Sequence, residues 1–336
     1  MRCPGRTRAR RATASAPAGL RHRRTGRLHP GRSSAADGRG GAKGCVVSGR
    51  LFWLASYPKS GNTWFRAFLR NLECGAKQPA SINDLGATSL AAGRAGMDEL
   101  LGFDTADLSC GETENLRPAI DRFVSSRLER PVYRKIHDAC HRIDAGDWLI
   151  DSEASAGALY LIRNPLDVAI SYAHHAAGSI DEAIASMADP DHRLARAEEG
   201  GGAKPQVEQR LLTWSDHVSS WVDQQRIPVM VLRYEDMATQ GAEAFARAAH
   251  FLGLGVEREE IERAVEFSSF ATLRRQEEKE PFRERAQGSP SFFRKGAIGD
   301  WQTGLTGAQI ARIVATHRQV MQRFGYCDAA GVPQVM

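Results

Sequence analysis

The amino-acid sequence predicts an α/β protein with three layers (α/β/α), in which helices cover both faces of a central parallel sheet. From Leu51 onward, short apolar runs alternate with segments of helical periodicity, and the connections between them are short. This alternation is typical of one α/β domain built on a parallel sheet. Ligands of such sheets bind at the carboxyl ends of the strands, so the strand ends should converge on a site.

Short apolar or alternating runs predict four strands, at 51–56, 130–137, 158–163 and 228–237. Helical spacing predicts helices at 62–72, 166–176, 203–225, 241–252, 257–267 and 306–326. Residues 73–128 look irregular, with short helices. Asn164 is placed to cap the helix that follows the third strand, with Pro165 in its first turn and Asp167 completing a capping-box-like pair.

Charge and composition divide the chain into three parts: a basic extension at 1–48, a domain at 49–328 and a tail at 329–336. Residues 1–48 hold eleven Arg and one Lys against one Asp, which makes 12 − 1 = +11. They carry almost no large apolar side chains, so we expect disorder there. The whole chain is +5, which leaves 5 − 11 = −6 for the remainder. A mildly acidic body argues against nucleic-acid binding by the folded domain.

The basic extension allows several readings that the sequence leaves open. It lacks the apolar stretch of a secretory signal, but an Arg-rich, acid-poor leader is also typical of a transit peptide. A start site assigned too far upstream would give the same composition. A basic arm that binds nucleic acid is a further hypothesis for the function of the chain.

The turn YPKSGNTW at 57–64 joins the first strand to the first helix. The unpaired N–H groups of a helix start and the helix dipole favour an anion at this position. Gly61 lets the backbone approach a ligand closely, while Lys59, Ser60 and Thr63 add donors. The order differs from the ATP-binding P-loop because the lysine precedes the glycine. The alternative is a turn stabilised by Pro58 and Gly61, with Lys59 in solvent.

Two further segments carry cations near glycines or strand ends. Arg163 ends the third strand, and Ser171 follows eight residues later on the next helix, so both are suited to a second phosphate. Arg294 and Lys295 precede Gly296 in a loop of a kind that closes over a polyanion. Each feature alone is also compatible with an exposed arginine, a packed serine or a surface turn.

In this order, YPKSGNTW, LIRNPLDVAISYAHH and RKGAIGDW resemble the sulfotransferases that use 3'-phosphoadenosine 5'-phosphosulfate (PAPS). The likeness covers nearly all of residues 51–326 and includes YEDM and SSFATL. It implies a sulfotransferase fold, which is similar to that of P-loop NTPases. It also implies a cytosolic-type sulfotransferase domain, in a member of the family similar to the bacterial ones. Asn62 stands where the family has threonine, and Asp138-Ala139 replaces its Leu-Pro.

The resemblance implies functions for individual residues. The residues implied to bind PAPS are Lys59, Ser60, Gly61, Asn62, Thr63, Trp64, Arg163, Ser171, Tyr234, Ser268, Leu273, Arg294, Lys295 and Gly296. His137 is implied as the general base, and Lys59 with Lys135 as the cations that stabilise the leaving oxygen. Four of these cations, Lys59, Arg163, Arg294 and Lys295, match a donor that approaches four negative charges, since each phosphomonoester carries roughly −1.5 to −2.

The sequence therefore predicts a sulfuryl transfer from PAPS to a hydroxyl, or an amine, of a small-molecule acceptor, without a metal. Six scattered cysteines without a CxxC pair indicate free thiols and a cytoplasmic location. No run reaches the ~18 apolar residues of a membrane span. The acceptor and the oligomeric state stay open.

Two alternatives concern the same residues. An ATP-dependent kinase would use Asp236 of YEDM as a magnesium ligand, although the lysine order counts against it. His137 would otherwise be a core histidine, or part of a metal cluster within HDACH (137–141), for which no second Cys/His cluster is evident.

Overall fold

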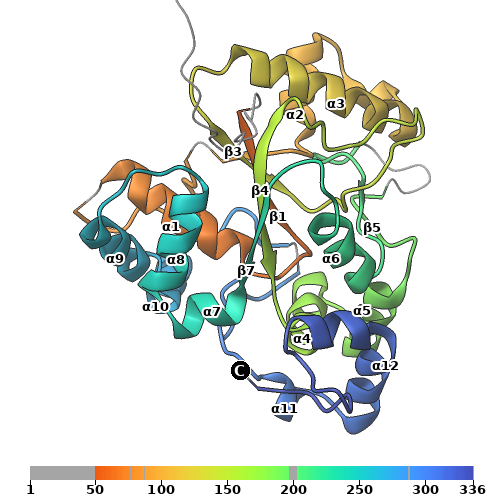
Figure 1. Cartoon of the computed structure of the whole chain (residues 1–336), viewed down its shortest axis with the longest axis vertical. Coiled ribbons are helices and arrows are strands. Elements are labelled where there is room, and N and C mark those ends of the chain that lie inside the picture. The colour runs from red at the N-terminus through yellow and green to blue at the C-terminus, as the bar shows by residue number, and fades with distance from the viewer. Residues whose placement is uncertain (1–49, 76, 87, 197–202, 287, 336) are drawn as a thin grey trace, which may run out of the picture. The chain divides into compact units, whose positions relative to one another are not determined.

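The computed structural model describes residues 50–335 except 76, 87, 197–202 and 287. The predicted disordered extension at 1–48 lies outside these residues. The five-stranded sheet has the order β2-β3-β1-β4-β7, and every neighbouring pair is parallel (Figure 1). Its strands are β1 (Leu51–Ser56), β2 (Ser89–Leu90), β3 (Val132–Ile136), β4 (Ser155–Ile162) and β7 (Val229–Arg233). A separate antiparallel pair joins β5 (Arg193–Leu194) to β6 (Gln209–Arg210).

Alternate residues of the central strands face two different cores, which makes the fold three-layered as predicted. Trp53 and Tyr160 lie in the core that includes the helices α4, α5, α6 and α12, whereas Leu54 and Leu159 lie in the core with α1, α8 and α9. Figure 1 shows α1, α8 and α9 on one side of the sheet and α5, α6 and α12 on the other. The bounds are α1 (Asn62–Cys74), α4 (Pro165–Ala176), α5 (Ile180–Ala188), α6 (Trp214–Val222), α8 (Ala242–Phe251), α9 (Arg258–Phe267) and α12 (Gly307–Arg323).

The remaining helices connect or extend these layers. They are α2 (Arg94–Leu101), the 3-10 helix η1 (Thr105–Asp107), α3 (Cys110–Arg127), α7 (Tyr234–Thr239), α10 (Phe270–Lys279) and α11 (Trp301–Gly304). The expectation of short helices in 73–128 misses α3, which has 18 residues. Its start is fixed by a capping box between Ser109 and Glu112, although Pro118 within it removes one backbone donor.

The predicted helix at 203–225 is wrong in its first half. Only α6 is helical, and it starts after Thr213, whose side chain accepts a hydrogen bond from the Asp216 N–H. Upstream, Val207 and Leu211 are buried, and their N–H groups donate to the carbonyls of Ala92 and His192. The apolar residues that suggested one helical face therefore pack against separate parts of the domain.

The predicted strand at 228–237 is also too long. Strand β7 ends at Arg233, and Tyr234 starts helix α7. Asn164 caps α4 as predicted, since its side chain accepts from the Leu166 N–H. The capping-box pair is wrong: the Asp167 carboxylate accepts instead from the N–H groups of Gly299 and Trp301, at 2.9 and 3.0 Å.

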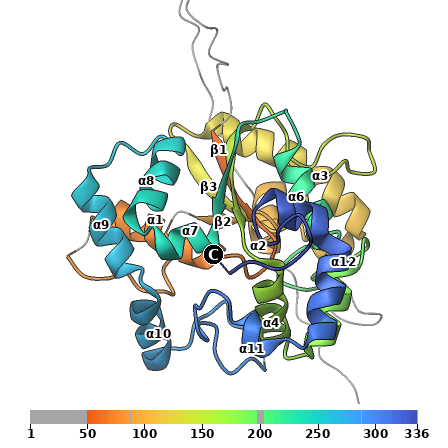
Figure 2. The same cartoon turned by 60° about the horizontal axis from the view of Figure 1, so that its bottom comes forward.

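The carboxyl ends of β1, β3, β4 and β7 all lie at one edge of the sheet, because the strands are parallel neighbours. Helices α4 and α7 begin at this edge, which comes forward in Figure 2. The convergence that the sequence predicted is therefore confirmed. It brings the β1–α1 turn, the residues after β3, the end of β4 and the start of α7 to one place.

We expect Phe245→Ala to destabilise the domain by about 3–5 kcal/mol, because it empties an aromatic cluster behind the β1–α1 turn. Phe245 is fully buried, and its ring centroid lies 4.4 Å from that of Phe68 and 5.7 Å from that of Trp64. Urea unfolding measures the change, with Phe123→Ala as the control because Phe123 is 45% exposed. Equal midpoints for the two variants would contradict the prediction.

Candidate active site

A cavity of about 460 Å³ opens at the carboxyl edge of the sheet. Thirteen of the sequence-predicted site residues line it: Lys59, Gly61, Asn62, Thr63, Trp64, Lys135, His137, Arg163, Ser171, Tyr234, Arg294, Lys295 and Gly296. Three others do not. The Ser268 hydroxyl is buried and donates to the Ala264 carbonyl, Leu273 packs in an apolar cluster, and Ser60 is buried below the turn. Phe270, from the same segment as Ser268 and Leu273, does line the cavity.

The β1–α1 turn presents backbone donors to the cavity. Gly61 is the N-cap of α1 with φ 103°, and no side chain among the described residues caps the helix. The first N–H groups of α1 therefore have no partner within the helix and point toward the cavity end. A Cβ on Gly61 would lie 2.9 Å from both Met237 and Tyr234, so glycine is required by α7 as well as by the positive φ.

Asn62 has a different role from a phosphate ligand. Its Nδ2 donates to the Leu54 carbonyl at 2.8 Å and to the Ser56 hydroxyl at 3.3 Å. The side chain thus ties the start of α1 to the end of β1, and its amide donors are already used. Only its backbone N–H is left to contribute to an anion site.

Arg163 connects three segments around the cavity. Its guanidinium donates to the Lys59 carbonyl at 3.3 Å and to the Ala297 carbonyl at 3.0 Å. It also lies 4.2 Å from the centroid of the Tyr234 ring, whose hydroxyl donates to the Gly296 carbonyl at 3.1 Å. The end of β4 therefore holds the β1–α1 turn and the 294–297 loop together.

Arg294 and Lys295 share one carboxylate, that of Asp300, and the Lys295 Nζ lies 2.7 Å from it. The pKa of Asp300 is lowered although burial opposes this, because both cations donate hydrogen bonds to it. Beside it, Asp167 binds the N–H groups of Gly299 and Trp301. The loop with its two cations is thus anchored to α4 before any ligand arrives.

Lys59 is held in an unfavourable setting for an ammonium group. Burial first, and then the positive charges of Arg163 and Lys135, lower its pKa from 10.5 to about 7. Its Nζ lies 3.9 Å from the centroid of the Phe292 ring, a cation–π contact. Its φ of 69° is uncommon for a residue with a side chain. An anion in the cavity would stabilise the charged form.

His137 is oriented by a hydrogen bond to the end of β1. Its Nδ1 lies 2.8 Å from the Ser56 carbonyl oxygen, which can only accept, so Nδ1 carries the proton. Nε2 is left with a lone pair. Burial, followed by the charge of Lys135, lowers the pKa of His137 well below 6.5, so the imidazole is neutral at pH 7.

Lys135 lies beside His137 and is paired with Glu284 at 2.9 Å. Arg66 binds the same carboxylate at 2.8 Å. Burial would raise the pKa of Glu284, but the charges of Lys135 and Arg66 outweigh it and lower the pKa to about 2. Burial also lowers the pKa of Lys135, which Glu284 opposes. The pair holds the Lys135 ammonium group at the Glu284 carboxylate, in the cavity that His137 also lines.

Sequence reasoning missed several residues that line the cavity, including Tyr172, His175, Gln206 and Phe292. His175 lines the cavity, and burial lowers its pKa to about 4. Helical spacing offered one signal, since Ser171 and His175 are one turn apart on α4. Gln206 gave none, because it comes from the segment predicted as helix.

The residues proposed for metal binding do not form a metal site. Among the described residues, no three His, Cys, Asp or Glu side chains are grouped so that they could hold a metal ion. Asp236 does not line the cavity and pairs with Arg233 at 3.7 Å. The HDACH segment divides, since His137 contacts Ser56 while His141 contacts Glu114. The kinase hypothesis thus loses the ligand it named.

The chain is similar to known sulfotransferases over most of its length. A profile of the family described as Sulfotransferase domain matches residues 50–325. Cytosolic sulfotransferase 17 of Arabidopsis thaliana is 25% identical over 294 residues, which is 83% of this chain and 76% of the plant protein. Sulfotransferase 1A1 of Mus musculus is 22% identical over 280 residues, 80% of this chain and 83% of the mouse protein.

Solved structures show the same fold. Retinol dehydratase in complex with androsterone and the inactive cofactor PAP aligns with a TM-score of 0.52 at 18% identity, covering 81% of each chain. Its complex with retinol and PAP aligns with a TM-score of 0.51 at 19% identity, again over 81% of each chain.

None of the helices in the described part of the chain is long and apolar enough to cross a membrane. Because the family profile runs from the first strand to the end of the last helix, the chain belongs to the sulfotransferase family.

Proposed function

We propose that the chain transfers a sulfuryl group from PAPS to a hydroxyl, or an amine, of a small-molecule acceptor, with His137 as the general base. The sulfotransferase class and the PAPS donor follow from the family. The observation that carries the site assignment is the single cavity shared by Lys59, Arg163, Arg294, Lys295 and His137. These side chains come from distant parts of the sequence, and all of them line this cavity at one edge of the sheet. If they faced solvent separately, they would form no nucleotide site.

The cavity suits the nucleotide in charge and in unpaired donors. Arg163 keeps its Nε buried without a hydrogen-bond partner among the described residues, although both terminal nitrogens are used. Such a donor costs free energy unless a ligand accepts from it. The start of α1, Ser171 and the Arg294–Gly296 loop supply further donors, and Trp64 offers an aromatic face for adenine. Bound PAPS supplies a sulfuryl group on a phosphate leaving group.

The Nε2 of His137 can take the proton of an acceptor hydroxyl, because Nδ1 already donates to Ser56. A neutral imidazole is ready for this step without first losing a proton, and positioned base catalysis contributes typically 10²–10⁴-fold. Lys59 and Lys135 line the same cavity, where their positive charge can stabilise the negative charge that builds on the leaving oxygen.

The acceptor side of the cavity lies around His137. The cavity that contains His137 is also lined by Leu90, Tyr172, Leu194, Gln206 and Phe292, which add apolar and polar groups to its charged lining. A small molecule with an apolar body and a reacting hydroxyl fits this lining. The solved relatives hold androsterone and retinol, which supports this class of acceptor. The cytosolic relatives support a cytoplasmic location.

The decisive assay supplies sulfur-labelled PAPS or phosphorus-labelled ATP with a panel of phenols, alcohols and sugars. We expect labelled product from PAPS alone, and His137→Ala should lower kcat by about 10²–10⁴-fold because the base is removed. Calorimetry should show that this variant still binds adenosine 3',5'-bisphosphate (PAP). Transfer from ATP would support the kinase instead, and unchanged turnover would remove His137 from the mechanism.

Arg163→Ala should weaken PAP binding by about 1.5–3 kcal/mol, roughly 10- to 150-fold in Kd, because charge-assisted hydrogen bonding to phosphate is lost. Isothermal titration calorimetry measures this change. Arg274→Ala is the matched control, since the Arg274 side chain is 57% exposed on α10 and pairs only with Glu278 in the described part of the chain. Wild-type affinity in Arg163→Ala would contradict its assignment.

Binding of PAP above pH 7 should be accompanied by proton uptake. With a pKa of about 7, Lys59 is mostly neutral at pH 8 in the free protein. The phosphate charge raises that pKa, so a proton enters with the ligand and affinity falls as the pH rises beyond 7.

Calorimetry in buffers of different ionisation enthalpy measures this uptake. Lys59→Arg should abolish most of it, because a guanidinium stays protonated throughout the range. Equal uptake by the wild type and Lys59→Arg would exclude Lys59 as the titrating group and leave Lys135, whose pKa is also lowered.

A further inference from the structure

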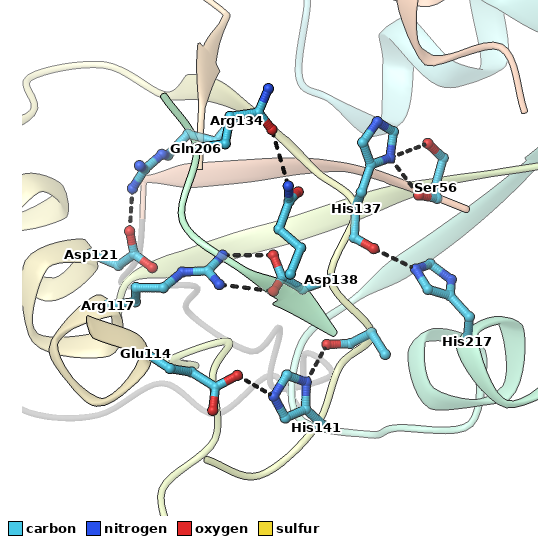
Figure 3. A network of polar contacts seen from close by, with 12 residues as sticks. Ser56, Glu114, Arg117, Asp121, Arg134, His137, Asp138, His141, Gln206 and His217 are labelled. Atoms are coloured by element: carbon cyan, nitrogen blue, oxygen red, sulfur yellow. Dashed lines mark hydrogen bonds and ion pairs between the residues drawn. The ribbon is translucent and has the colours of Figure 1, made fainter. Parts of the chain in front are cut away.

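Helix α3 carries a row of three polar side chains on one face. Glu114, Arg117 and Asp121 are spaced by three and four residues, so they lie along a single stripe. The stripe contacts β3 and the loop after it, at His141, Asp138 and Arg134 respectively (Figure 3). These partners flank His137 on both sides in the sequence.

The central contact of the row is the most buried of the three and has two hydrogen bonds. The guanidinium of Arg117 donates to both oxygens of Asp138, at 2.8 and 2.7 Å. The Arg117 side chain is 4% exposed and that of Asp138 is 0% exposed. A two-pronged pair of this kind fixes orientation as well as distance. Asp138 is the residue directly after the base, so its position sets the path of the backbone through His137.

The backbone around His137 has further partners from other elements. The carbonyl of His137 accepts from the His217 Nε2 at 2.9 Å, and that of Asp138 accepts from the Trp221 Nε1 at 2.9 Å. The Ala139 N–H donates to the Arg210 carbonyl at 2.8 Å. With the side chain of Asp138 held by α3, this segment can move neither along nor across the edge of the sheet without breaking a buried contact.

Stability alone is a weak reason to bury this ion pair. Removing two charges from water costs several kcal/mol per ion, and apolar residues of similar volume are often as good or better.

We propose that Arg117 and Asp138 are positioning residues that hold His137 in line with the donor. The inference rests on the proposed function, since it assumes that His137 is the base. Neither Arg117 nor Asp138 lines the cavity, so the pair acts through the backbone of His137. Its loss should change the chemical step and leave nucleotide binding intact.

The decisive variant replaces the pair by apolar residues of similar size, Arg117→Met with Asp138→Leu. We expect it to fold with an unchanged or higher Tm. The value of kcat should fall about 10- to 100-fold, because a misplacement of about 1 Å costs up to 10²-fold, while the KM for PAPS stays within about twofold of the wild type. Folded protein with wild-type kcat would overturn the proposal.

Arg117→Lys keeps the charge and loses the two-pronged geometry, so it serves if the double variant fails to fold. We expect a smaller fall in kcat, about 3- to 10-fold, with the same KM for PAPS. Unchanged kcat would again overturn the proposal. The matched control is Arg122→Met, which breaks the more exposed α3 pair with Asp151 and should leave kcat as it is.

Nitrogen-15 NMR of the histidine imidazoles reads the position of the base without turnover. The His137 signal, assigned by its absence in His137→Ala, should show the Nδ1–H tautomer in the wild type. In the double variant we expect a mixture of tautomers, because Ser56 no longer lies at a fixed distance. A single unchanged tautomer there overturns the positioning role, whereas a wild type without sulfuryl transfer overturns the proposed function.

Discussion

The concentration of positive charge in one buried cavity is the constraint on which the rest of this structure depends. Burial, and then repulsion by Arg163 and Lys135, lowers the pKa of Lys59 to about 7. The protein accepts this cost at the edge where four strands end, because a multiply charged ligand relieves it. A cavity of this kind binds an anion more tightly the less its own carboxylates neutralise it.

The acidic residues near the cavity therefore hold the cations in place while leaving the net charge positive. Asp300 binds Arg294 and Lys295 together, and Glu284 binds Lys135 and Arg66, so one carboxylate serves two cations in each case. Each carboxylate carries one negative charge and binds two cations, so net positive charge remains for the ligand. The carboxylates also fix side chains that would otherwise lose rotamer entropy when the nucleotide binds.

How far the sequence predicts this arrangement depends on how local each signal is. The strands at 51–56 and 158–163 and the turn at Lys59 follow from runs of adjacent residues, and the structure confirms both strands. The features that the sequence did not predict are placed by tertiary contacts. Gln206 reaches the cavity only because its segment pairs with Gly93, and Asp167 binds the N–H groups of Gly299 and Trp301, 132 and 134 residues away. The hydrophobic pattern of a window of a dozen residues reveals neither contact.

The distinction between local and long-range signals also separates the residues that would bind the donor from those that orient His137, the proposed base. Short motifs are sufficient for the donor, because a helix start and a few cations bind phosphate wherever a strand ends. His137, the proposed base, needs a fixed backbone, and its restraints come from β1, α3 and α6 through Ser56, Arg117 and His217. Those residues lie up to 81 positions from His137. The position of His137 is therefore set by contacts from elsewhere in the fold, and a short motif around it contains none of them.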